Sequence, residues 1–230
     1  MRLISKRKTV ASLLAASLTT MSFSSMAAEE DVRLWTSLVM DGELTDSTRW
    51  TAEIQPRFKN SGKEFDQLIV RPSVSYALSK QSSVALGYAY VETETAQRTS
   101  KEDRLWQQFS YQSKWNDFSW SSRTRLEQRD LDISDETSHR LRQMFRASHP
   151  VAPESEWHAL AWNELFINLN DTAWAGRSGI NQNRAFAGVM WRYDKKSRVE
   201  LGYLNQVINV GGNRENQMNH VLASTWFIGF

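Results

Sequence analysis

The chain has 230 residues, with 28 basic and 26 acidic side chains and no cysteine. Four of the basic residues and none of the acidic ones precede residue 28, so the remainder is slightly negative and lacks the basic excess typical of nucleic-acid binding. The absence of cysteine excludes a disulfide framework, so the fold must be held together without covalent cross-links.

The first 27 residues have the pattern of a secretory signal peptide. A basic start is followed by a mostly small and apolar run over residues 10–23, and Ser25-Met26-Ala27 offers a small-x-small cleavage site. The apolar run is too short to cross a bilayer as a helix. We therefore expect cleavage after Ala27 and export, which leaves residues 28–230 as a single domain.

Residues 31–230 alternate between apolar and polar side chains almost throughout, which indicates β-strands. In RWTAEIQPRF (49–58), for example, apolar side chains at even positions alternate with polar and charged side chains at odd positions. Each segment has about the ten residues that a tilted bilayer-crossing strand needs. The expected strands are 31–40, 49–58, 67–78, 83–92, 103–115, 118–129, 139–149, 157–168, 183–193, 198–207 and 217–230.

The connections between these segments alternate in length. Short turns at 79–82, 116–117, 151–156 and 194–197 alternate with longer polar loops, and aromatic residues flank the short turns. Short periplasmic turns, longer extracellular loops and an aromatic girdle are typical of an outer-membrane barrel. We expect a closed antiparallel transmembrane β-barrel of about 10 to 12 strands. The eleven segments conflict with the even number usual for such barrels.

The chain ends within the last alternating segment, HVLASTWFIGF. Trp226, Ile228 and Phe230 would share one apolar face, which is a pairing hazard in water unless the face meets lipid and the strand closes a sheet. This pattern resembles the terminal signal that the outer-membrane barrel-assembly machinery recognises. The alternative is a soluble β-sandwich with one wet face. Long strands, loops sorted by length and the apolar terminus favour the barrel.

Several motifs together resemble a family of uncharacterised proteobacterial outer-membrane-type barrels, known only as a numbered domain of unknown function. The motifs are Arg71-Pro72 followed by Gly87-Tyr88, RLWQQ (104–108), RLEQR (125–129), RLR (140–142), NELFINLN (from Asn163), NQNRAFAGV (181–189) and ELGYLNQ (200–206). Their order covers most of the chain after residue 27. The resemblance implies an outer-membrane barrel with outer-membrane lipid, lipopolysaccharide and the assembly machinery as partners, and it implies no activity.

If the aromatic faces of the strands point outward, the opposite faces give the barrel an arginine-rich lumen. The lumen-lining candidates are Arg57, Arg71, Arg104, Arg123, Arg125, Arg140, Arg142, Glu164, Arg184, Arg192 and Glu200. A lumen with excess cationic charge favours anionic solutes, and the sequence therefore predicts a small anion-favouring channel. The alternative is a non-conducting scaffold or interaction barrel whose interior is filled by paired Arg and Glu side chains.

The turns predict particular cross-strand neighbours. Arg192 is expected near Glu200 across the 194–197 turn, where an ion pair would offset the charge of Arg198. Across the two-residue turn at 116–117, Gln108 is expected to face Arg125 inside the barrel.

An outer-membrane hydrolase is a third and weaker hypothesis. The chain has four histidines, His139, His149, His158 and His220, and none has the spacing to a serine or carboxylate that would indicate a nucleophile and its base. The sequence also contains no phosphate loop, dinucleotide fingerprint or metal-ligand cluster. We therefore expect no catalytic residues, no metal and no cofactor.

Overall fold

The computed structural model describes residues 30–209 and 216–230, so the expected signal peptide lies outside the described residues. The described part of the chain is all-β, and none of its residues forms a helix long and apolar enough to cross a membrane. The strands are β1 Glu30–Glu43, β2 Thr48–Lys59, β3 Glu64–Ala77, β4 Ser82–Glu94, β5 Thr99–Trp115, β6 Phe118–Leu131, β7 Ser138–Pro150, β8 Trp157–Asn168, β9 Gly179–Arg192, β10 Arg198–Ile208 and β11 Gln217–Gly229. Each overlaps one expected segment, and several begin or end up to four residues outside it.

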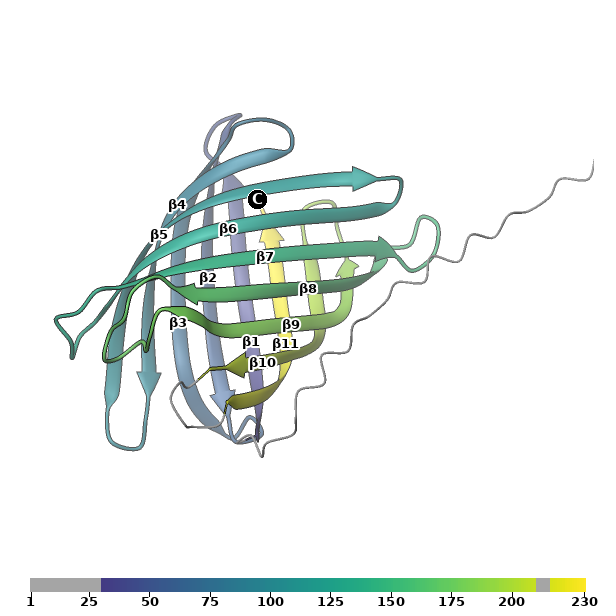
Figure 1. Cartoon of the computed structure of the whole chain (residues 1–230). Coiled ribbons are helices and arrows are strands. Elements are labelled where there is room, and N and C mark those ends of the chain that lie inside the picture. The colour runs from purple at the N-terminus through teal and green to yellow at the C-terminus, as the bar shows by residue number, and fades with distance from the viewer. Residues whose placement is uncertain (1–29, 210–215) are drawn as a thin grey trace, which may run out of the picture.

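These strands form one closed barrel, in which sequential neighbours pair and β1 also pairs with β11 (Figure 1). Sequential strands are antiparallel, whereas β1 and β11 are parallel, from Glu30 opposite Met218 to Asp41 opposite Gly229. The expectation of a fully antiparallel barrel was therefore wrong at this one pair. An odd number of strands that run alternately up and down can close only if the first and last are parallel.

The two ends of the barrel differ in their connections. The end at which β1 finishes, called here the turn end, carries the connections 44–47, 78–81, 116–117, 151–156 and 193–197. The opposite, loop end carries 60–63, 95–98, 132–137, 169–178 and 209–216. The sorting by length is weaker than expected, because β3 and β5 begin early and leave only four residues in each of the first two loops. The described chain starts at the loop end and finishes at the turn end.

The outer face of the barrel is apolar and exposed. Large side chains such as Val74, Leu86, Leu105 and Leu222 are between 47% and 64% exposed. Aromatic side chains gather around the turn end, as expected, and all are exposed: Tyr76, Trp115, Phe118, Trp120, Trp157, Trp191, Tyr193 and Phe230. The barrel thus presents to its surroundings the side chains that a soluble protein usually buries.

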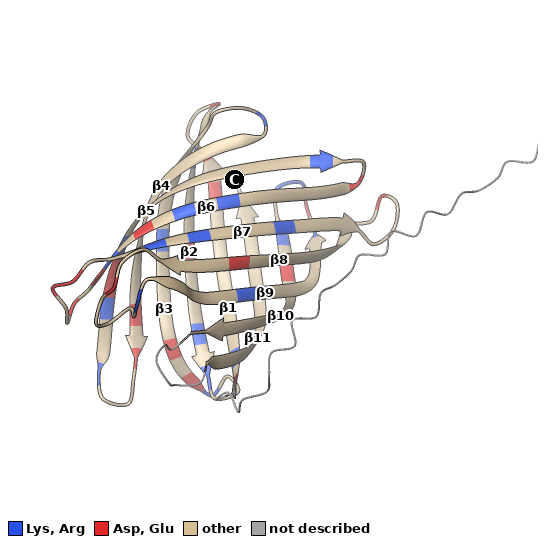
Figure 2. Ribbon diagram, in the orientation of Figure 1, with Lys and Arg blue, Asp and Glu red and all other residues tan. Residues whose placement is uncertain are grey.

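The inner face combines charged side chains with an apolar cluster. Glu127 and Arg142 are 1% and 6% exposed, which marks a charged interior. Figure 2 shows that basic and acidic residues occur along the strands as well as in the loops. Beside it lies a buried cluster of Trp35, Leu160, Phe186, Met190, Leu204 and Val221. The assumption that aromatic faces point outward was therefore incomplete, because large rings also fill part of the interior.

Two inward-facing glycines make room for these rings. A Cβ atom at Gly87 would lie 2.1 Å from the Trp106 indole, and one at Gly202 would lie 2.6 Å from the Phe186 ring. Real Cβ atoms do not approach so closely, so each ring packs directly on a glycine backbone.

Candidate functional site

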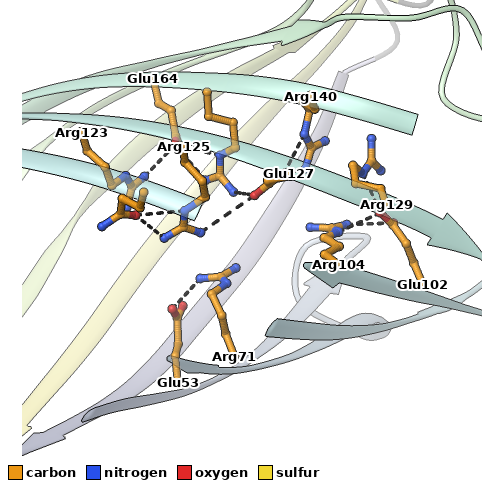
Figure 3. A network of polar contacts seen from close by, with 12 residues as sticks. Glu53, Arg71, Glu102, Arg104, Arg123, Arg125, Glu127, Arg129, Arg140 and Glu164 are labelled. Atoms are coloured by element: carbon orange, nitrogen blue, oxygen red, sulfur yellow. Dashed lines mark hydrogen bonds and ion pairs between the residues drawn. The ribbon is translucent and has the colours of Figure 1, made fainter. Parts of the chain in front are cut away.

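Ion pairs inside the barrel join several strands into one network. Glu127 on β6 accepts hydrogen bonds from Arg140 Nε at 2.9 Å and from Arg142 Nη1 at 2.7 Å. Glu164 on β8 accepts hydrogen bonds from Arg123 Nη2 at 2.6 Å and Arg142 Nε at 3.0 Å. Arg142 therefore holds both buried carboxylates at once, and Figure 3 shows the two glutamates among these guanidinium groups.

Further pairs lie around this network. Glu102 accepts hydrogen bonds from Arg104 Nε at 2.8 Å and Arg129 Nε at 2.6 Å, close to the loop end. On the opposite wall, Arg71 Nη1 lies 2.5 Å from Glu53 Oε2 (Figure 3). The Glu53–Arg71 and Glu102–Arg129 pairs each join two neighbouring strands, whereas Glu102 and Arg104 lie on the same strand.

A third group lies near the turn end. Glu200 on β10 accepts hydrogen bonds from Arg146 Nη1 and Nη2 at 2.8 and 2.7 Å, and from Arg198 Nε at 3.0 Å. The expected ion pair between Arg192 and Glu200 is not present among the described residues. Arg192 stands opposite Arg198 in the sheet and is exposed, and Arg146 from across the barrel takes its place.

Arg57 and Arg184 differ from these arginines, because neither has a carboxylate within ion-pair distance among the described residues. Arg57 donates from Nε at 3.0 Å to Gln55 Oε1 and from Nη1 at 2.9 Å to Gln67 Oε1. Both guanidinium groups lie against the ring of Trp35, with Cζ to centroid distances of 3.9 Å for Arg57 and 4.9 Å for Arg184. A cation against an indole face is stabilised without losing its charge.

Arg125 and Arg184 make further contacts with amides and rings in the interior. Arg125 donates from Nη2 to Gln108 Oε1 at 2.6 Å, as the turn at 116–117 predicted, and its Cζ lies 3.9 Å from the Trp106 ring centroid. Its nearest carboxylate is 3.9 Å away on Glu127. Arg184 also lies 4.6 Å from the centroid of the Phe166 ring. Arg57, Arg125 and Arg184 therefore contact side-chain amides or aromatic rings and make no hydrogen bond to a carboxylate among the described residues.

Three cavities follow one another along the barrel. A central cavity of about 410 Å³ lies between a loop-end cavity of about 360 Å³ and a turn-end cavity of about 530 Å³. The central and loop-end cavities share the side chains Trp35, Arg57, Arg71, Arg142 and Arg184, and the central and turn-end cavities share Arg146. The spaces are thus adjacent and are separated by arginine side chains.

Cationic side chains outnumber acidic ones in the lining of all three cavities. Seven arginines and three glutamates line the central cavity, and eight arginines with two acids line the loop-end cavity. Seven lysines and arginines line the turn-end cavity together with Asp194. The Asp194 carboxylate accepts hydrogen bonds from the backbone N–H groups of Lys196 and Ser197 at 2.6 and 2.9 Å, and the first of these contributes most to lowering its pKa.

Every lumen-lining candidate from the sequence borders one of these cavities. The candidates Arg57, Arg104, Arg125, Arg140, Arg142, Glu164 and Glu200 are buried. Arg71, Arg123 and Arg184 are half-buried, and Arg192 is exposed at the mouth of the turn-end cavity. The three residues of the expected assembly signal, Trp226, Ile228 and Phe230, lie elsewhere, at the turn end of β11.

The interior aromatic residues were not among the sequence-predicted site residues. Trp35, Trp106 and Phe166 each stand against at least one guanidinium group. A signal for one of them was present in RLWQQ, where Trp106 has the same strand parity as Arg104 and so must share its face. An aromatic side chain can lie on either face of a strand. Its face can be predicted when a charged residue stands two positions away, because the two side chains then point to the same side.

That the protein has no catalytic residues and no metal site stays a prediction from the sequence. Within the described residues no group of three or more His, Asp or Glu side chains is placed to hold a metal ion. His220 lies on the outer face, where its Nδ1 is 2.5 Å from the hydroxyl of Tyr203. His149 Nδ1 lies 2.7 Å from the carbonyl oxygen of Pro150.

The fold and its interior define a closed eleven-stranded β-barrel with a cationic core. Comparison with known proteins gives the family: residues 32–219 match the family described as Protein of unknown function (DUF2490), and the chain belongs to it. An uncharacterised protein of Methylorubrum extorquens is 34% identical over 226 residues, covering 95% of this chain and 97% of the relative. The predicted resemblance to a numbered family is therefore confirmed. No solved structure matches the chain.

Proposed function

We propose that the protein is an outer-membrane β-barrel that forms a narrow conduit for small anionic solutes. The proposal includes export by a signal peptide over residues 1–27, a single barrel domain over residues 28–230, and outer-membrane lipid, lipopolysaccharide and the barrel-assembly machinery as partners. Neither an enzymatic activity nor a nucleic-acid partner is part of it.

The observation that carries the proposal is the inverted polarity of the barrel. Large apolar side chains are exposed on the outside, whereas arginines and glutamates are buried inside. In water the exposed face would cost about 25 cal/mol for each Å² of apolar surface, whereas lipid removes that cost. A closed sheet also leaves no unpaired edge, which is the condition for crossing hydrocarbon with strands.

The preference for anions is supported by the lining of the cavities. Cations outnumber acids in each of the three, so a diffusing anion would meet a favourable potential along the whole series of spaces. Confinement between walls of low dielectric strengthens this effect, while cations are repelled. The passage between the central and loop-end cavities, which is lined by Arg57 and Arg184, would then be the narrowest and most selective part of the conduit.

Two experiments test this proposal. Full-length protein made in a Gram-negative cell should lose residues 1–27, fractionate with the outer membrane and migrate differently on a gel after boiling. Refolded into a planar bilayer, it should conduct with a higher permeability for chloride than for potassium. Recovery as a soluble periplasmic monomer would refute the barrel in the membrane, and cation selectivity would refute the anionic path.

A filled, non-conducting scaffold is the second candidate, and the network around Arg142 favours it. Glu127, Glu164, Arg140 and Arg142 are almost fully buried and are joined to one another by hydrogen bonds. If such pairs close the passage between the cavities, the refolded protein will show no conductance although it inserts. The same bilayer measurement therefore separates the two candidates.

A further inference from the structure

The central cavity has two unlike walls. Its apolar side chains come mainly from one continuous part of the barrel, β8 to β11 and β1, and include Trp35, Trp162, Phe186, Leu204 and Phe227. Its arginines come mainly from the other part, β2 to β7: Arg57, Arg71, Arg123, Arg125, Arg142 and Arg146. A ligand in this cavity would therefore meet an aromatic surface on one side and guanidinium groups on the other.

Three arginines that line the central cavity make no hydrogen bond to a carboxylate among the described residues. Arg57 donates only to amide oxygens in the described structure, and the carboxylate nearest to Arg125 is 3.9 Å away. Arg184, on β9, also has no ion pair among the described residues and lies against the rings of Trp35 and Phe166. Burying charge without a counter-charge is costly, so an anion in this cavity would be stabilised.

The cavity lining is also short of hydrogen-bond acceptors. Three buried polar atoms on its lining residues have no hydrogen-bond partner, namely Trp35 Nε1, Trp106 Nε1 and Arg123 Nε. All three are donors, and the two tryptophans are 4% and 3% exposed. These three atoms have almost no accessible surface, so they mark a lining that is poor in acceptors and are not donors that face the cavity.

Short side chains leave the space that a ligand would occupy. Besides Arg71, the lining on β3 and β4 is made of the short side chains Ser73, Ser75, Ser83 and Ala85. Across the cavity, Trp162 and Phe186 stack with centroids 5.2 Å apart and an interplanar angle of 7°. The volume of about 410 Å³ lies in the range of roughly 300–1,000 Å³ found for small-molecule sites.

We infer that the central cavity binds a small organic anion, whose carboxylate is held by Arg57, Arg125 and Arg184 and whose apolar body lies against Trp162 and Phe186. The inference rests on the anionic preference in the proposed function and names the class of solute. It does not require conduction. An inorganic anion would use only the basic wall, and a neutral aromatic compound would use only the apolar one.

Titration of the refolded protein in detergent with three probes tests this inference. Benzoate carries both features, inorganic phosphate only the charge, and benzyl alcohol only the ring. We expect saturable 1:1 binding of benzoate by calorimetry, with an affinity higher than that of either other probe by about tenfold or more, as expected when both walls contribute. Equal binding of phosphate and benzoate, or no saturable benzoate binding, would overturn the inference.

Variants assign the binding to this cavity. The double substitution Arg57→Gln and Arg184→Gln should weaken benzoate binding by about tenfold or more, since two charge-assisted contacts are lost. It leaves no carboxylate unpaired, because neither arginine has an ion pair in the described structure, so the barrel should still fold. Arg49→Gln, at the exposed turn end of β2 and outside the central cavity, is the matched control and should bind as the wild type does.

Trp162→Leu tests the other wall. It should weaken benzoate while leaving any weak phosphate binding unchanged. Wild-type benzoate affinity in both the arginine and the tryptophan variants would place binding elsewhere and overturn the inference. Benzoate binding without conductance would refute the conduit alone, and conductance without benzoate binding would refute the site alone.

Discussion

Arg146 on β7 and Glu200 on β10 are joined across the barrel interior by two hydrogen bonds of 2.8 and 2.7 Å, although two strands separate them in the wall. Neighbouring strands are already held by backbone hydrogen bonds, so a pair between non-neighbours constrains the shape of the barrel in a different way. The pair therefore restrains the distance between β7 and β10 near the turn end.

Replacing Arg146 with Gln should lower the free energy of unfolding by about 1.5–3 kcal/mol, the usual worth of hydrogen bonds to a charged group. Urea titration of the refolded protein measures it. Arg192→Gln is the matched control, because Arg192 is exposed nearby and makes no ion pair within the described residues; it should change the midpoint little. A double-mutant cycle with Glu200→Gln isolates the coupling, and additive effects would show that the cross-barrel pair contributes nothing.

Arg142 and Arg57 should respond differently to the same substitution. Arg142→Gln removes a partner from both Glu127 and Glu164, and breaking a buried pair typically costs about 3–5 kcal/mol. Arg57→Gln breaks no ion pair in the described structure and should cost clearly less. Urea midpoints of the two refolded variants provide the comparison. Equal losses would mean that the carboxylates around Arg142 are not dependent on it.

The terminal strand should be needed for assembly. The backbone N–H of Phe230 donates to the carbonyl oxygen of Asp41 at 2.9 Å, and the Phe230 ring stacks on Trp50 with centroids 6.1 Å apart. Phe230 thus holds the end of β11 to β1 and β2, where the barrel closes. Deleting Phe230, or changing Trp226 and Phe230 to Ser, should reduce the level of protein in the outer-membrane fraction.

The matched control for the terminal strand is Tyr203→Ser, which removes an exposed aromatic side chain from the middle of the neighbouring strand, away from the closure contact. It should assemble at close to the wild-type level. If the Phe230 deletion also reached the outer membrane in wild-type amount, neither the closure contact nor the terminal pattern would matter for assembly.

Much of the fold could be predicted from alternation alone. The period of two located all eleven strands, because each has one face in the interior and the other outside. The parallel pairing of β1 with β11 could not be predicted in this way, since alternation carries no information on which strands meet. The eleven expected segments conflicted with an even number of strands only because closure by antiparallel pairing was assumed.

The candidate site was predictable in composition and not in pairing. Parity placed the arginines on one face, and Gln108 opposite Arg125 followed from a two-residue turn. Glu200, however, pairs with Arg146 from a distant strand, because side chains meet across the interior as well as along the wall. No local pattern encodes such a contact. The interior rings were missed for a related reason: Trp162 and Phe186 are as compatible with a packed core as with a lipid-facing surface.

The final prediction concerns the orientation of the barrel, and it uses the absence of cysteine from the chain. If the loop end faces the outside of the cell, a single cysteine at Ser134 should react with a membrane-impermeant maleimide in intact cells. One at Glu154, in the 151–156 turn, should react only after the outer membrane is permeabilised. Because β1 begins at the loop end, a cysteine at Asp31 should behave like the one at Ser134. An even-stranded barrel would place Asp31 with Glu154 instead, so labelling of Asp31 only after permeabilisation would contradict the parallel closure of β1 on β11.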